Sequence, residues 1–136
     1  MTAKEYLLQY RRIKSRLNAM AEQYESLKSA AEYIGVQYSE VPKPPLPDVR
    51  RGEKAIIRMM EMESRMNKEF ARLADINETI ESLSDPLHQA VLVKRYISGK
   101  AWKVIAAEVF ITTRHLRRVH SRALKAIETA IKKDVR

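Results

Sequence analysis

The sequence predicts an all-α protein in which a long antiparallel helical hairpin, coiled-coil-like in pattern, precedes a C-terminal helix–turn–helix domain. Two stretches within residues 1–83 repeat apolar residues at alternating spacings of four and three, and residues 84–136 contain shorter apolar patterns bounded by turn signals. A chain of 136 residues has room for one domain, or for one small domain with an appendage. We therefore expect a domain boundary between residues 83 and 84.

Residues 3–34 are expected to form the first long helix. Their apolar positions repeat over four heptads without interruption: Tyr6, Tyr10, Ile13, Leu17, Met20, Tyr24, Leu27, Ala31 and Ile34. Such a seam requires a partner helix, although the heptads do not show whether that helix belongs to the same chain. Gly35 is expected to end the helix. Residues 35–49 then form a connector.

The connector contains four prolines, Pro42, Pro44, Pro45 and Pro47. Prolines prevent a continuous helix and favour an extended, stiff polyproline segment. The spacing also matches a Pro-x-x-Pro ligand of a proline-binding module, but a stiff spacer explains the same residues.

Residues 50–83 are expected to form the second long helix, with the polar Glu69 interrupting its seam and Phe70 beside it. The apolar positions of this seam are Ala55, Met59, Met62, Met66, Leu73, Ile76, Ile80 and Leu83. Two helices of ~45–50 Å joined by a short spacer most simply form an antiparallel pair. The methionines are expected to pack in its core; an adaptable protein-binding surface is the alternative.

A two-helix hairpin buries limited area, and its seams carry bulky side chains such as Tyr10, Tyr24 and Phe70. We therefore expect two hairpins to associate, so that residues 1–83 form a homodimer.

The C-terminal part begins with a helix-start signal. Ser84-Asp85-Pro86 places a capping side chain before a proline at the first helical position. This helix is expected to run from Leu87 to about Ile97 and to end at Gly99.

A second short helix is expected over residues 101–109. Its apolar residues Trp102, Ile105, Ala106 and Val109 share one face, so Trp102 is predicted to anchor the core. Residues 109–112 form the turn, and Thr112 is expected to cap the last helix.

The last helix is predicted to have two chemically distinct sides at about 100° per residue. The apolar side contains Leu116, Val119, Ala123, Ile127 and Ala130, with Leu124 and Ile131 at its edge. The opposite side contains Arg114, Arg117, Arg118, Ser121, Arg122 and Lys125. A helix that buries one side and offers guanidinium groups on the other fits a DNA major groove.

The charge distribution agrees with a polyanionic partner. The chain has a formal net charge of +9, and residues 84–136 hold 12 basic and 4 acidic side chains, against 14 and 13 in residues 1–83. A basic C-terminal part beside a nearly neutral remainder indicates that the two parts have different tasks. The alternative is a charged face that simply contacts solvent.

Several classes of protein are disfavoured. The chain has no cysteine, no apolar run near the ~20 residues that span a bilayer, no signal-peptide core and no glycine-rich phosphate loop. His88, His115 and His120 do not share a helical face, so no metal site is expected. No nucleophile with its base and no pair of poised carboxylates is recognisable, so we expect neither an enzyme nor a cofactor.

The pattern in residues 83–130 resembles region 4, the promoter-reading part of bacterial sigma factors. The resemblance is carried by Arg95, Tyr96, Gly99, Trp102, Ile105, Ala106, Ile111, Thr112, Leu116, Val119, Ala123 and Leu124. It is closer still to the small sigma-like regulators of Gram-positive bacteriophages and prophages, the ArpU/RinA-type late transcription regulators. The resemblance implies a DNA-binding transcriptional regulator in the cytoplasm of a bacterial host cell, with double-stranded DNA as its partner.

The resemblance assigns base contacts to the start of the last helix, at Thr113, Arg114, Arg117 and Arg118. Charge and geometry assign phosphate contacts to Lys103, Thr112, Ser121, Arg122 and Lys125. Lys94 and Lys100 are expected to add to the positive field without a fixed contact.

One residue departs from the family pattern. Phe110 occupies a turn position where glycine or a small polar residue is usual, and a left-handed backbone costs a bulky residue ~1–2 kcal/mol. We expect either a different turn geometry or a Phe110 side chain held by packing, with the N-terminal helices as one candidate contact.

Two alternative functions fit the same elements. A DNA-packaging recognition subunit of the small-terminase type also joins a helix–turn–helix to helical oligomerisation segments. A sigma-like adaptor would instead contact RNA polymerase and bind DNA weakly or not at all.

Overall fold

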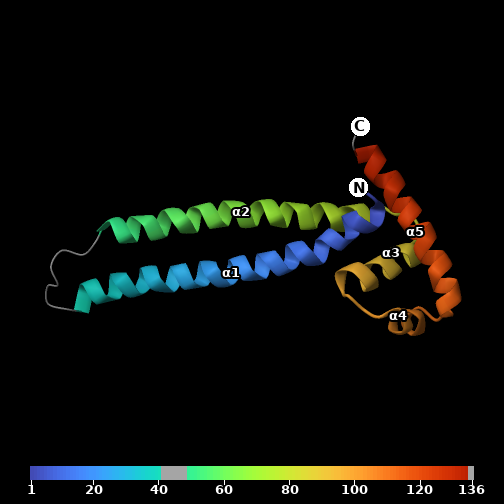
Figure 1. Cartoon of the computed structure of the whole chain (residues 1–136), viewed down its shortest axis with the longest axis horizontal. Coiled ribbons are helices and arrows are strands. Elements are labelled where there is room, and N and C mark those ends of the chain that lie inside the picture. The colour runs from blue at the N-terminus through green and yellow to red at the C-terminus, as the bar shows by residue number, and fades with distance from the viewer. Residues whose placement is uncertain (41–48, 135–136) are drawn as a thin grey trace. The chain divides into compact units, whose positions relative to one another are not determined.

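The computed structural model describes residues 1–40 and 49–134, with side chains for residues 1–32 and 52–133. Within these residues all regular structure is helical, which confirms the all-α class. The elements in chain order are α1 (Ala3–Glu40), α2 (Val49–Glu81), α3 (Pro86–Leu92), the π-helical turn η1 (Val93–Ile97), α4 (Trp102–Glu108) and α5 (Thr113–Asp134), as Figure 1 shows. None of these helices combines the length and the apolar character that crossing a bilayer requires.

The chain forms two compact units. One unit joins Met1–Lys14 to Arg72–Arg136, and the other contains Ser15–Ala71. The contacts thus group the first residues of α1 and the end of α2 with the C-terminal helices, whereas the predicted boundary lies between residues 83 and 84. The separate functions assigned to residues 1–83 and 84–136 stay a prediction.

The first helix is longer than expected, because α1 continues through Gly35 to Glu40. The predicted stop at Gly35 is wrong for a physical reason. A glycine inside a helix costs ~1 kcal/mol relative to alanine, which neighbouring residues can offset, whereas a proline restricts the residue before it to extended conformations. The connector prolines lie in residues 41–48, outside the described residues, so the polyproline spacer stays a prediction.

Two polar contacts fix the relative direction of the long helices within Ser15–Ala71. Arg16 Nη1 donates to Glu69 Oε1 at 3.1 Å, and Tyr24 Oη donates to Glu63 Oε1 at 2.5 Å. The later residue of α1 contacts the earlier residue of α2, so α1 and α2 run antiparallel in this unit. The carboxylate of Glu69, the polar interruption of the predicted seam, is thereby paired with a guanidinium.

Burial in Ser15–Ala71 is sparse. Among its described side chains only Leu17 is buried, at 5% exposure. The other seam residues whose side chains are described are half-buried: Met20, Tyr24, Leu27, Ala31, Ala55, Met59, Met62 and Met66. Phe70, which the sequence placed with the seam, is 53% exposed. This unit therefore gains little from apolar burial in a single chain.

The other unit has a continuous core to which the start of α1 contributes Ala3, Leu7 and Ile13. Leu7 is fully buried, although the predicted seam used Tyr6 instead. The Tyr6 ring lies at the edge of the core, where its hydroxyl forms a 3.0 Å hydrogen bond with Thr79 Oγ1. At the edge of the core the tyrosine hydroxyl can form its hydrogen bond, whereas leucine has no polar group and can be buried completely.

The helix-start signal at residues 84–86 is confirmed. The Asp85 side chain accepts a hydrogen bond from Leu87 N at 2.9 Å, and Pro86 is the first residue of α3. Downstream, α3 continues into the π-helical turn η1, and Gly99 adopts a φ of +71°. The left-handed φ favours glycine at this turn, whereas the Arg11 guanidinium that lies 2.7 Å from a Cβ built at Gly99 is the end of a flexible side chain and can shift aside.

The turn after α4 is closed by a pair of hydrogen bonds typical of the Schellman motif. Ile111 N donates to Ala106 O at 3.1 Å, and Phe110 N donates to Ala107 O at 3.4 Å. Phe110 occupies the position that glycine usually takes, with φ of 59° and a side chain that is 92% exposed. Both expectations for Phe110 are therefore wrong. The backbone is left-handed and no packing holds the ring; the two hydrogen bonds and the packing of Ile111 against the core hold the turn.

The predicted cap of α5 is confirmed, because Thr112 Oγ1 accepts from His115 N at 3.1 Å. The core beneath α4 and α5 is formed by Val91, Ile105, Ala106, Leu116 and Val119, with Leu87, Trp102, Val109 and Ile111 packed against it. Trp102 therefore contributes to the core, as predicted.

We predict that the free energy of unfolding of Phe110→Gly is about 1 kcal/mol higher than that of Phe110→Ala. Glycine removes the cost of the left-handed backbone, and neither variant loses buried contacts. Urea denaturation followed by circular dichroism measures this difference. Equal stability of the two variants would show that the turn is not strained.

Candidate nucleic-acid interface

One side of α5 is sealed against the core. Leu116, Val119, Ala123 and Ile127 are buried, which confirms the predicted apolar stripe. The residues predicted at its end and edge, Leu124, Ala130 and Ile131, are half-buried. Since this stripe is fixed, the orientation of every other side chain around α5 is fixed with it.

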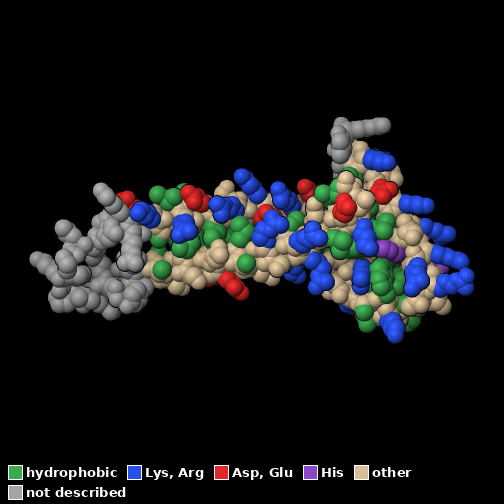
Figure 2. Space-filling view, viewed as in Figure 1, with side chains coloured by type: hydrophobic (Ala, Val, Ile, Leu, Met, Phe, Trp, Pro, Cys, Tyr) green, Lys and Arg blue, Asp and Glu red, His purple; other side chains and the backbone are tan. Residues whose placement is uncertain are grey.

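The opposite side of α5 carries the predicted cations. Arg114, Arg117, Arg118, Ser121, Arg122 and Lys125 are all exposed. Within the part of the chain that the structure describes, no ion pair joins any of these five cations to a carboxylate. Figure 2 shows the Lys and Arg side chains gathered over this helix. Their combined field is therefore uncompensated and attracts a polyanion.

A hollow of about 510 Å³ lies between the start of α4 and the first half of α5. It is lined by Trp102, Lys103, Thr113, Leu116, Arg117, His120 and Ser121. The structure thereby brings together four of the predicted site residues: Lys103 from α4 with Thr113, Arg117 and Ser121 from α5. Of these four, Lys103 and Ser121 are the predicted phosphate contacts, and they present an ammonium group and a hydroxyl group to the same hollow.

The remaining predicted residues lie beside this hollow in two places. Arg114, Arg118, Arg122 and Lys125 follow one another at helical spacings of four, four and three, so they form a row along the exposed side of α5. Thr112 lies at the N-terminus of the helix. Its oxygen already accepts from His115 N, but its hydroxyl hydrogen can still be donated.

A cluster of polar and aromatic side chains that the sequence pattern did not predict lies beneath the hollow. Arg95 lies 4.5 Å above the Trp102 ring, and Trp102 meets the His120 ring edge to face at 4.6 Å. Tyr96 Oη forms a 2.7 Å hydrogen bond with His120 Nε2. His120 follows Leu116 by four residues, so its helical spacing already placed it beside the apolar stripe. The contacts of His120 with η1 and α4 could not be predicted from helical spacing, because they depend on the tertiary fold.

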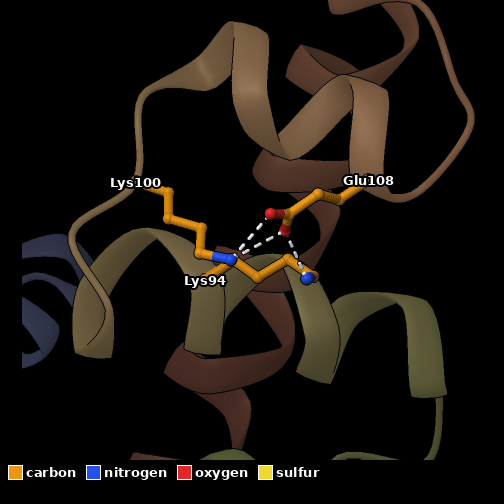
Figure 3. Close-up of polar contacts among 3 residues, drawn as sticks. All are labelled: Lys94, Lys100 and Glu108. Carbon is orange, nitrogen blue, oxygen red and sulfur yellow. Dashed lines mark hydrogen bonds and ion pairs between the residues drawn. The ribbon is translucent and has the colours of Figure 1, made fainter.

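Two lysines expected to act without a fixed contact are in fact engaged within the chain. Lys94 Nζ lies 2.5 Å from Glu108 Oε2, and Lys100 Nζ lies 2.7 Å from Glu108 Oε1, as Figure 3 shows. The hydrogen bonds from Lys100 and Lys94 hold the pKa of Glu108 below its ordinary value. One carboxylate at the end of α4 therefore binds both ammonium groups, while the expectation that these lysines make no fixed contact with DNA stays a prediction.

The three histidines have separate surroundings. His120 lies in the cluster under the hollow, His88 Nε2 lies 3.4 Å from Asp85 Oδ2, and His115 is exposed on α5. Among the described residues no group of three His, Cys, Asp or Glu side chains is placed to hold a metal ion.

No family model, curated protein or solved structure matches this chain. The identity of the site must therefore be argued from its own geometry.

The pKa of His120 lies below its ordinary value, first because the ring is buried and then because Lys4 and Arg95 add positive charge nearby. An unfolded chain lacks both effects, so it binds the proton more readily than the folded protein does. Folding stability from this group is thus fully present above the ordinary histidine pKa of ~6.5 and is lost as the pH falls through the lower folded value.

We predict that the free energy of unfolding declines between pH 7 and pH 5 more steeply in the native chain than in His120→Gln. Urea denaturation at a series of pH values measures this slope. His115→Gln, at an exposed position on the same helix, is the matched control for replacing a histidine. A slope unchanged by His120→Gln would show that His120 does not contribute to the pH dependence.

Proposed function

We propose that this protein is a sequence-specific, DNA-binding transcriptional regulator that acts as a homodimer, with α4, the turn and α5 forming a helix–turn–helix of the sigma region-4 type. One observation carries the proposal. Helix α5 buries Leu116, Val119, Ala123 and Ile127 on one side and presents on the other side five cations that form no ion pair with a carboxylate of the described residues. A positive field that is not compensated within the chain favours the complex with a polyanion over the free protein.

The arrangement of α4 and α5 supports the major groove as the place of contact. A recognition helix contacts base edges with residues near its N-terminus, while the preceding helix lies across the backbone. Thr113, Arg114, Arg117 and Arg118 occupy the first two turns of α5. An arginine that reaches O6 and N7 of one guanine contributes ~1–3 kcal/mol of discrimination.

The hollow supports the assignment of phosphate contacts. Lys103 and Ser121 lie on its wall, so a backbone phosphate placed there would meet an ammonium from α4 and a hydroxyl from α5. Arg122 and Lys125 extend the cationic row toward the middle of α5, and Thr112 can donate from its N-terminus. These five residues would fix the register of α5 in the groove without reading the sequence.

The phage or prophage origin rests on the resemblance of residues 83–130 to the ArpU/RinA-type regulators. A single module of this kind reads only a few base pairs, so a homodimer would supply a second half-site. Light scattering of the purified chain then distinguishes this proposal from a packaging subunit: two chains support the regulator, and a ring of eight or more supports packaging.

We predict that Arg117→Ala combined with Arg118→Ala flattens the preference among DNA sequences, whereas Lys125→Ala weakens all sequences by a similar factor. The double variant loses base contacts of ~1–3 kcal/mol each, and the single variant loses only a phosphate contact. The measurement is selection from a random DNA pool, followed by binding titrations of selected and scrambled sites. Full preference retained by the double variant would contradict the assigned reading surface.

We predict that the logarithm of the association constant falls linearly with the logarithm of the salt concentration, with a slope of about −0.9 per phosphate neutralised. Lys125→Ala is expected to reduce this slope by about one phosphate. Arg58→Ala, which removes an exposed cation from α2, is the matched control and should leave the slope unchanged. Binding that does not respond to salt would contradict a phosphate interface.

A further inference from the structure

The unit Ser15–Ala71 exposes large apolar side chains on α2, away from its seam with α1. Ile56 and Ile57 are each 55% exposed, Met60 is 63% exposed and Phe70 is 53% exposed. Figure 2 shows hydrophobic side chains on the surface of the two long helices. Single exposed apolar residues are ordinary, but several that share one part of a helix indicate an interaction surface.

These residues share one sector of α2 that is nearly free of charge. At about 100° per residue, the sector covers roughly 140° of the helix between residues 56 and 71. We name it the charge-poor sector; it contains Ile56, Ile57, Met60, Glu63, Ser64, Asn67, Phe70 and Ala71. Its one charged side chain, Glu63, accepts the hydrogen bond from Tyr24 Oη. Arg58, Glu61 and Arg65 lie on other sides of the helix.

A charge-poor surface is unusual on an exposed helix of a chain whose residues are 32% charged. A shallow groove of about 500 Å³ runs along the sector, lined by Met60, Glu63, Ser64, Asn67, Lys68 and Ala71. A second helix could lie in such a groove and bury the apolar residues beside it.

We propose that the charge-poor sector binds the same sector of a second copy of this chain, with the two α2 helices antiparallel. Reversal of α2 about the midpoint between Glu63 and Ser64 maps the eight positions onto themselves. Residue 56 exchanges with 71, 57 with 70, 60 with 67, and 63 with 64. A two-fold contact requires that the positions of the surface repeat under this reversal, and the positions of this set do so.

The area agrees with a dimer of modest size. A large aromatic side chain carries ~150–250 Å² in all, so each of the four half-exposed apolar residues leaves roughly 100 Å² to be covered. Two copies would bury on the order of 800 Å² from these residues alone, and flanking residues would have to supply the remainder of the ~1,200–2,000 Å² of a specific interface. A single chain buries few apolar side chains in Ser15–Ala71, so covering the exposed ones in a dimer would stabilise this unit.

This inference names the surface used by the homodimer of the proposed function, but its test needs no DNA. The chain contains no cysteine, so single cysteines can be introduced and oxidised without background. Ile56→Cys mixed with Ala71→Cys is expected to give a disulfide-linked dimer on a non-reducing gel. Ile56→Cys alone is not, because antiparallel packing separates the two copies of residue 56 by about 22 Å.

Two variants at neighbouring positions of α2, one inside the charge-poor sector and one outside it, test whether this sector forms the contact. Ser64→Cys should cross-link with itself at least tenfold more than Arg65→Cys, which lies about 100° away around α2. Comparable cross-linking of both variants would overturn the assignment. Cross-linking of Ile56→Cys with itself would show parallel pairing and would equally overturn the proposed register.

Sedimentation equilibrium of the full chain gives an independent measure. Met60→Glu should raise the dimer dissociation constant at least tenfold, whereas Arg58→Glu should change it less than threefold; circular dichroism checks that both remain helical. A native chain that is monomeric at 100 µM would overturn the proposal. Loss of DNA binding with an intact dimer would instead contradict only the DNA-reading function.

Discussion

The burial of one side of α5 is the constraint on which the candidate site depends. Leu116 and Ile127 are completely enclosed, so α5 cannot rotate about its axis without exposing them. The guanidinium groups on the other side consequently keep one direction relative to α4 and its hollow. The same apolar contacts that stabilise the C-terminal fold therefore also present the cations in a fixed geometry, before any ligand is bound.

Within this unit, one group of cations is paired with a carboxylate and another group is not. Glu108 binds Lys94 and Lys100 and ties the end of α4 to the segment that precedes it. The cations of α5 have no such partner among the described residues. An internal ion pair at the surface adds little stability, and the single negative charge of Glu108 offsets one of the two lysine charges. Among the described residues of the C-terminal part, the largest group of cations without a carboxylate partner therefore lies along α5.

Local patterns in the sequence predicted the helices and both faces of α5, because those features depend on residues a few positions apart. Asp85 and Thr112 were predicted correctly as caps for the same reason. The stop at Gly35 failed because glycine only weakens a helix. Phe110 and the Glu108 pairs were not predictable, since a backbone held by tertiary packing and contacts across eight and fourteen residues leave no periodic signal. The cationic row on α5 was found in full, whereas the aromatic cluster beneath it required the fold.

The sparse burial of Ser15–Ala71 has a thermodynamic consequence. A segment with one enclosed leucine among its described side chains opens at a lower free energy than one with a continuous core. The well-buried helices α3 to α5 thus contrast with the sparsely buried unit Ser15–Ala71. Under the proposed pairing of α2, folding of the long helices would respond to protein concentration, whereas exchange of backbone amides in α3 to α5 with solvent would respond less.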